Sequence, residues 1–136
     1  VRDNSPSRAI VIALEGELGA GKTTFVKAFA RALGISQKLT SPTFVLMRSY
    51  PISPYNPCLA GRQVKPITYN LLYHIDAYRL RDHRDLLPLG VKKIMANPSN
   101  IVLIEWAERV KNILPKKHLT IHFNHVDTNT RQILIK

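Results

Sequence analysis

The sequence of residues 16–23 is Gly16-Glu17-Leu18-Gly19-Ala20-Gly21-Lys22-Thr23. It is a complete G-x-x-x-x-G-K-T phosphate loop, whose glycines let the backbone turn tightly and bring its N–H groups close to phosphate oxygens. Lys22 can reach the β- and γ-phosphates of a nucleoside triphosphate, and the hydroxyl of Thr23 can bind Mg²⁺. We therefore predict a nucleotide site over residues 16–24, with Thr24 as its last residue.

The segments on either side of the loop agree with this interpretation. Residues 9–14 are a nearly continuous apolar run rich in β-branched side chains, which is typical of a strand buried on both faces of a parallel sheet. Residues 24–33 carry apolar side chains at helical spacing, and Gly34 stands where a helix C′ residue belongs. A plain glycine turn is the alternative, but motif and context together favour a phosphate site at a helix N-terminus.

Composition narrows the class of protein. A chain of 136 residues with 45% hydrophobic residues suits a single domain with one core. No apolar run approaches a membrane span, no signal-type segment is present, and the one cysteine, Cys58, excludes a disulfide framework. We expect a cytoplasmic protein with no membrane partner. Residues 1–8 are expected to be flexible and the proline-rich stretch 51–66 to be a mobile loop.

The net charge is the most unusual feature of the composition. The formal net charge is +11 and the isoelectric point about 10.2, values typical of a protein that attracts polyanions such as RNA or acidic protein surfaces. The basic residues form small groups at 79–81, 92–93 and 116–118 rather than a long tail. A solvated basic surface and a functional patch are both compatible with this pattern.

The remaining chain predicts an alternation of strands and helices. Further strands are predicted at 43–50, 67–78 and 101–104, helical segments at 82–97 and 106–113, and a hairpin within 118–136 that turns at 127–130. The predicted fold class is α/β. It is P-loop NTPase-like, with a mixed, largely parallel sheet flanked by helices and a C-terminal β-hairpin.

Two acidic residues are candidates for the metal and the attacking water. Glu105 follows a buried strand, which is where P-loop folds keep the acidic partner of the metal or the water. In a strand, His74, Asp76 and Tyr78 would share one face. Because Mg²⁺ keeps several waters, one carboxylate with Thr23 and phosphate oxygens suffices. An exposed strand-end carboxylate and a cross-strand polar cluster are the structural alternatives.

The base of the nucleotide is predicted by exclusion. Residues 124–127 read Asn-His-Val-Asp and follow a strand, as the guanine-reading N-K-x-D motif does. They lack the lysine and lead into a turn and another strand, so turn chemistry is the better interpretation. With nothing in the sequence to read guanine, ATP is the expected nucleotide.

Ordered blocks of sequence carry a resemblance to a known family. They are residues 14–24 with the phosphate loop, 31–35, Ser41-Pro42-Thr43-Phe44, His74-Ile75-Asp76-Ala77-Tyr78-Arg79 and Glu105-Trp106. In this order they resemble the bacterial TsaE (YjeE) family, small ATPases of tRNA threonylcarbamoyladenosine (t6A) synthesis. The resemblance covers roughly residues 10–124.

The resemblance implies a P-loop fold, ATP with Mg²⁺, and slow hydrolysis in partnership with TsaD and TsaB, whose complex modifies tRNA. It implies Lys22, Thr43 and Glu105 as catalytic residues and Thr23, Asp76 and Glu105 as metal ligands. Thr43 would sense the γ-phosphate or the metal, as a switch threonine does. Glu105 would orient or deprotonate the attacking water, and Trp106 would shape the site or a partner surface.

The chain also departs from the family pattern. The segment before the first strand is short, and the connection between Tyr50 and His74 is longer than usual. Residues 89–93 are basic where the family tends to be acidic, and Glu17 stands where the family often has Asp. Two alternative functions stay open on the residues alone: a small P-loop kinase, and a nucleic-acid-binding adaptor with structural ATP. Weak or indirect tRNA contact is compatible with the family interpretation.

Overall fold

A mixed sheet forms the centre of the molecule in the computed structural model, which describes residues 6–55, 61 and 68–136. The sheet has six strands in the order β2-β3-β4-β1-β5-β6. The strands are β1 (Ile10–Gly16), β2 (Met47–Pro51), β3 (Leu71–Asp76), β4 (Asn100–Glu105), β5 (Leu119–His125) and β6 (Arg131–Ile135). β3, β4, β1 and β5 run parallel, and β2 and β6 add antiparallel edges. The predicted sheet and its C-terminal hairpin are therefore confirmed.

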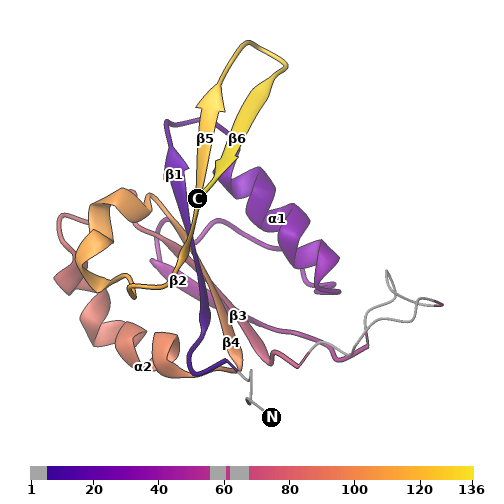
Figure 1. Cartoon of the computed structure of the whole chain (residues 1–136), viewed down its shortest axis with the longest axis vertical. Helices are drawn as coiled ribbons and strands as arrows, with labels where there is room; N and C mark the ends of the chain where they lie inside the picture. Colours follow the sequence, from indigo (N-terminus) through magenta and orange to yellow (C-terminus); the bar gives the residue numbers. More distant parts are fainter. Residues whose placement is uncertain (1–5, 56–60, 62–67) are drawn as a thin grey trace.

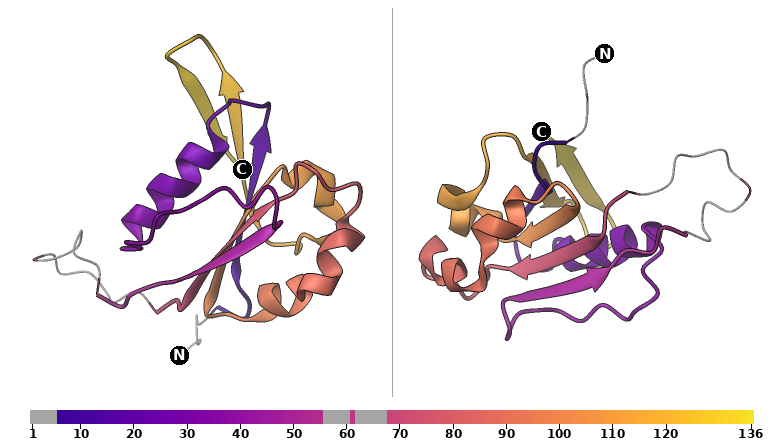
Figure 2. Two further views of the ribbon diagram at one scale, coloured as in Figure 1. Left: turned by 180° about the vertical axis from the view of Figure 1, so that it is seen from behind. Right: turned by 90° about the horizontal axis from the view of Figure 1, so that it is seen from below.

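Helical segments cover both faces of the sheet (Figure 1). The helix α1 (Lys22–Ala32) lies on one face, while α2 (Val91–Ala96) and the 3₁₀ segments η2 (His83–Leu89) and η3 (Ala107–Ile113) lie on the other. Side chains of β1 alternate between two buried clusters, with Leu14 on the α1 side and Ala13 on the opposite side. Seen from behind, the β5–β6 hairpin extends beyond the other strands (Figure 2).

The first helix follows the phosphate loop directly. It begins at Lys22 and ends at Ala32, and Gly34 adopts a φ of 79° with its N–H bonded to the carbonyl of Arg31. This left-handed glycine closes the helix as the sequence predicts. The ring of Phe25 packs 5.7 Å from that of Phe123, and so joins the helix to β5.

Three predicted elements differ from the observed ones. The strand expected at 43–50 begins only at Met47, because the N–H groups of Val45 and Leu46 both bond to the carbonyl of Pro42 in a turn. The strand expected at 67–78 is β3 alone, and residues 68–70 are not in a strand. The helix expected at 106–113 is the 3₁₀ segment η3, which begins only after Trp106 with its φ of 57° and is kinked at Val110, where φ is −129°.

Two further predictions meet the structure only in part. The helical pieces expected over 82–97 are present as η2 and α2, separated at Gly90. Of the expected mobile loop, Pro51 belongs to β2 and Ile52 is buried, with its N–H 2.8 Å from the carbonyl of Asn70. Residues 53–55 and Gly61 are described and belong to no strand or helix, whereas residues 56–60, with Cys58, residues 62–66 and most of the expected flexible N-terminus lie outside the described residues. None of the described helices has the length and apolar character that a membrane crossing requires.

Candidate functional site

The phosphate loop connects the end of β1 to the start of α1, and its shape requires glycine at two positions. A Cβ atom at Gly16 would lie 2.5 Å from the carbonyl oxygen of Phe123, so no side chain fits there. Gly21 has a φ of 105° and turns the chain into α1. The free N–H groups of the first helical turn therefore face the cavity beyond the loop.

This cavity has a volume of about 370 Å³ and collects most of the predicted site residues. Its lining consists of Leu18, Gly19, Ala20, Gly21, Lys22, Thr23, Thr24, Ser41, Thr43, Asp76, Tyr78, Glu105 and Trp106. The loop residues come from the β1–α1 connection, and the two acids come from the carboxyl ends of β3 and β4. Gly16 and Glu17, at the start of the motif, do not line this cavity but accept hydrogen bonds from Lys22.

Lys22 is held in place by the loop itself. Its ammonium group donates to the carbonyls of Gly16 and Glu17, the latter at 2.8 Å, and lies 4.0 Å from the centre of the Trp106 ring. Burial lowers the pKa of Lys22, while the negative charges of Glu108, Glu105 and Asp76 oppose that shift. The side chain is 5% exposed, so its cation is confined beside the loop amides.

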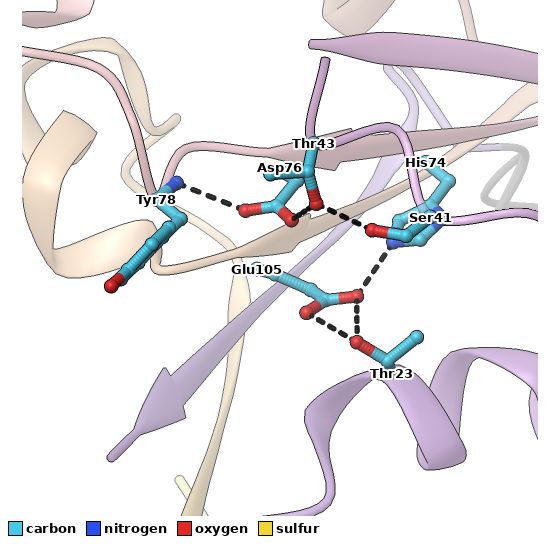
Figure 3. A network of polar contacts seen from close by, with 7 residues as sticks. All are labelled: Thr23, Ser41, Thr43, His74, Asp76, Tyr78 and Glu105. Atoms are coloured by element: carbon cyan, nitrogen blue, oxygen red, sulfur yellow. Dashed lines mark hydrogen bonds and ion pairs between the residues drawn. The ribbon is translucent and has the colours of Figure 1, made fainter. Parts of the chain in front are cut away.

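Glu105 accepts hydrogen bonds from two directions (Figure 3). The hydroxyl of Thr23 donates to its carboxylate, 3.0 Å from Oε1 and 2.9 Å from Oε2. On the other side, Nε2 of His74 lies 2.7 Å from Oε1. Glu105 is 3% exposed and His74 is 1% exposed, so this contact is buried.

The surroundings of His74 indicate which of its two ring nitrogens carries the proton. Its Nδ1 atom is buried and has no hydrogen-bond partner among the described residues. A proton on Nδ1 would be a buried donor without an acceptor, which is costly, so the proton sits on Nε2 and is donated to Glu105. Thr23 gives its only hydroxyl proton to the same carboxylate. The lone pairs of Thr23 Oγ1 are thus left for a cation.

Asp76 forms a second network, which joins the sheet to the connection before β2. The Thr43 hydroxyl donates to its Oδ2 at 2.9 Å, and the Tyr78 N–H donates to its Oδ1 at 2.9 Å. The Ser41 hydroxyl lies 2.6 Å from that of Thr43. Asp76 and Glu105 are paired in the register of the parallel strands β3 and β4, which places both carboxylates on one edge of the sheet (Figure 3).

The residues present fit the phosphates of a nucleotide together with Mg²⁺. No group of three or more His, Cys, Asp or Glu side chains in the described part of the chain could hold a metal by itself. A hydroxyl with free lone pairs beside one carboxylate is instead the donor set of a cation that shares its ligands with phosphate and water. Thr23 with Glu105 supplies that set, and Asp76 lies at the neighbouring strand end.

The comparisons with known proteins identify the family. A family model described as "Threonylcarbamoyl adenosine biosynthesis protein TsaE" matches residues 3–133. The chain belongs to the TsaE family. The fold of a family member is also matched: the crystal structure of Bacillus subtilis YdiB gives a TM-score of 0.65 at 30% sequence identity, covering 94% of this chain and 68% of that one.

Curated relatives carry the name tRNA threonylcarbamoyladenosine biosynthesis protein TsaE. The Treponema pallidum protein is 36% identical over 92% of this chain and 80% of its own length. The Bacillus subtilis protein is 36% identical over 90% of this chain. The Haemophilus influenzae protein is 33% identical over 88% of this chain. The chain spans 66% of the length of each of these last two proteins.

Three site features of this TsaE family member were not predicted from its sequence. They are the contact of His74 with Glu105, the Trp106 ring over Lys22 and the hydroxyl of Ser41 on Thr43. The sequence places His74 on the face of Asp76, yet its partner belongs to the neighbouring strand. Tyr78, expected on that face, lies beyond the end of β3 and contacts Asp76 through its main chain.

Proposed function

We propose that this chain binds Mg·ATP and hydrolyses it slowly, as a nucleotide-gated component of the cytoplasmic machinery that makes t6A in tRNA. The observation that carries this proposal is the bond between Thr23, which follows the phosphate-loop lysine, and the buried carboxylate of Glu105. In P-loop NTPases the metal is held by a hydroxyl after the loop lysine and by an acid at a strand end, and Thr23 and Glu105 correspond to these two groups. The family and the names of its relatives supply the biological setting.

The proposed chemistry is mainly positioning and charge stabilisation. The loop amides and Lys22 hold the phosphates, and Thr23 with the nearby acids holds Mg²⁺. When bound, Mg²⁺ neutralises charge that develops on the transferred phosphoryl oxygens. Glu105 holds the Thr23 hydroxyl and orients or deprotonates the attacking water, while His74 fixes the position of Glu105 without touching the nucleotide.

Thr43 supplies the proposed nucleotide gate. Its hydroxyl contacts Asp76, yet the chain around it is exposed, with Phe44 82% exposed and Val45 49% exposed. A new bond from Thr43 to the γ-phosphate or the metal would shift this exposed segment. The state of the nucleotide would thereby be reported at the surface.

Calorimetry and hydrolysis assays test the proposal directly. The unmodified chain should release or absorb heat with Mg·ATP and turn it over slowly, whereas Lys22→Ala should lose binding and Glu105→Ala should retain binding but lose hydrolysis. Lys27→Ala, an exposed lysine of the same helix, is the matched control and should behave as the unmodified chain. Absence of binding in the unmodified chain, or equal hydrolysis rates in all variants, would remove the proposed chemistry.

TsaD and TsaB are the proposed partners. The exposed segment of residues 43–45, which we call the gate segment, offers a surface for them. Phe44 and Val45 lie beside the site, and Leu18 of the phosphate loop is 74% exposed. Exposed apolar groups at one site are typical of a protein interface. Capture of TsaD and TsaB should therefore depend on ATP and weaken in Phe44→Ser. Ile135→Ser, which alters another exposed apolar residue, should leave capture unchanged.

A further inference from the structure

The acidic residues that the structure describes are confined to one edge of the sheet. Every acidic residue that the structure describes lies at the carboxyl end of a parallel strand or in the connection that follows it. They are Glu15, Glu17, Asp76, Asp82, Asp85, Glu105, Glu108 and Asp127. The carboxyl edge therefore carries nearly all the negative charge and also the nucleotide site.

The opposite edge of the sheet carries a cluster of unpaired cations. Arg8 precedes β1, Lys92 and Lys93 belong to the short helix before β4, and Lys116 and Lys117 precede β5. All five are exposed, and no ion pair to any of them is found among the described residues. We call these residues the amino-edge surface.

Two adjoining hollows show that Arg8, Lys92 and Lys117 lie together, while Lys93 and Lys116 are their neighbours in sequence and line neither hollow. One, of about 540 Å³, includes Arg8, Lys117 and His118 in its lining, and the other, of about 290 Å³, includes Arg8 and Lys92. Among the residues that the structure describes, no acidic side chain lines either hollow. The start of β1 and the end of α2 are tied by the Ala9 N–H, 3.0 Å from the Met95 carbonyl, and lie near the lower end of Figure 1.

We infer that the amino-edge surface binds the phosphate backbone of RNA. Several exposed cations around adjoining hollows, with no acid among them, suit a polyanion whose charges are closely and regularly spaced. The imidazole of His118, at the rim, can stack on an unpaired base. RNA is favoured over an acidic protein because the family acts in the biosynthesis of a tRNA nucleoside.

The sheet separates this RNA surface from the nucleotide site. β1 spans Ile10–Gly16, so at about 3.3 Å per residue its two ends are roughly 20 Å apart. Arg8 lies before one end and the phosphate loop follows the other. RNA on the amino-edge surface and Mg·ATP in the loop can therefore be bound together, and neither competes with the other.

The test measures binding of a labelled tRNA transcript by fluorescence anisotropy over about 50 to 200 mM KCl. The variant Lys92→Gln/Lys116→Gln/Lys117→Gln removes three charges from the amino-edge surface. The control Lys27→Gln/Arg48→Gln/Arg81→Gln removes three exposed charges from elsewhere. We expect the first variant to bind at least about tenfold more weakly, with a salt slope reduced by about 2, and the control to change little.

Two competition measurements test where the RNA binds and whether the surface prefers RNA to an acidic polypeptide. Saturating Mg·ATP should leave the affinity for tRNA unchanged, and polyglutamate should compete poorly. The inference is overturned if tRNA does not bind at low salt, if both triple variants lose equal affinity, if Mg·ATP displaces tRNA, or if polyglutamate competes as well as RNA. The basic tRNA-binding measurements need no ATP, so they test the RNA surface even if the proposed ATPase function proves wrong.

Discussion

The two strand-end carboxylates of the site are neighbours in the sheet but are held by different parts of the molecule. Glu105 is fixed from within, by a buried histidine and by the first turn of α1. Asp76 is fixed by Thr43, which belongs to an exposed connection and in turn contacts Ser41. Both acids are nearly inaccessible, at 3% and 5% exposure.

This difference indicates that the two carboxylates have different roles within one site. A carboxylate held by core residues keeps its position whatever is bound, which suits chemistry that requires a fixed oxygen. A carboxylate held by an exposed segment can exchange partners when that segment moves, which suits a switch. We therefore expect substitutions around Glu105 to affect the rate of hydrolysis and those around Asp76 to affect the response to nucleotide.

The largest contrast is expected between Glu105→Gln and Asp76→Asn. Glutamine keeps the shape of Glu105 but cannot accept a proton or carry charge, so kcat should fall by about 10²-fold or more. Asp76→Asn should lower kcat by about tenfold and raise the Mg²⁺ concentration needed for half-maximal rate. Steady-state hydrolysis over a Mg²⁺ series measures both. Equal losses of kcat in the two variants would contradict the proposed difference in role between the two carboxylates.

A smaller effect is expected at His74. His74→Leu removes the Nε2 donor and frees one oxygen of Glu105, so kcat should fall about 10- to 100-fold with little change in KM. His74→Gln places an amide N–H near the position of Nε2 and should restore most of the rate. His74→Asn places its donor nearer Nδ1 and should not.

These His74 variants also separate positioning from simple stability. Thermal unfolding of each variant shows whether the sheet is intact. In the unmodified chain, ¹⁵N NMR should show the proton of His74 on Nε2. Equal kcat in His74→Gln and His74→Leu, or a proton on Nδ1, would show that His74 has no positioning role.

At Thr43 we expect an effect on nucleotide response rather than on chemistry. Thr43→Val removes the hydroxyl that bonds to Asp76 and should weaken ATP-dependent partner capture by about tenfold, the value of one hydrogen bond to a charged group. Thr43→Ser keeps the hydroxyl and is the control. Capture that is equally strong with and without ATP in the unmodified chain would contradict the gate.

The smallest effect is expected far from the site, at the start of η2. Hydrogen bonds from the side chain of Arg84 lower the pKa of Asp82 from an ordinary 3.8 to about 2. A lowered pKa stabilises the fold above about pH 4, and this stabilisation is lost as pH falls through 2. Asp82→Asn keeps a helix-capping side chain but loses the exposed ion pair with Arg84, so the melting temperature should fall by about 1 °C at pH 7 and by less near pH 2, with hydrolysis unchanged. An equal shift at both pH values would contradict the assignment.

Sequence reasoning was strongest where local chemistry fixes local structure. The loop glycines, the buried run before them and the apolar spacing after them predict β1, the phosphate loop and α1 to within two residues at each end. It was weaker where a turn depends on packing. Leu46 adopts a φ of 65° and Trp106 one of 57°, conformations that no local preference of these residues favours, and each displaced a predicted boundary.

The sequence by itself determined the P-loop, its lysine and threonine, the strand that Glu105 follows, Asp76 as a second candidate acid and the basic character of the chain. These follow from residue type and spacing, which are local properties. Only the tertiary structure decided that His74 contacts Glu105 rather than Asp76, that Thr43 contacts Asp76, and that the described acids and the cations of the amino-edge surface occupy opposite edges. Those relations depend on which strands become neighbours and in what register, because a parallel sheet brings together residues that lie far apart along the chain.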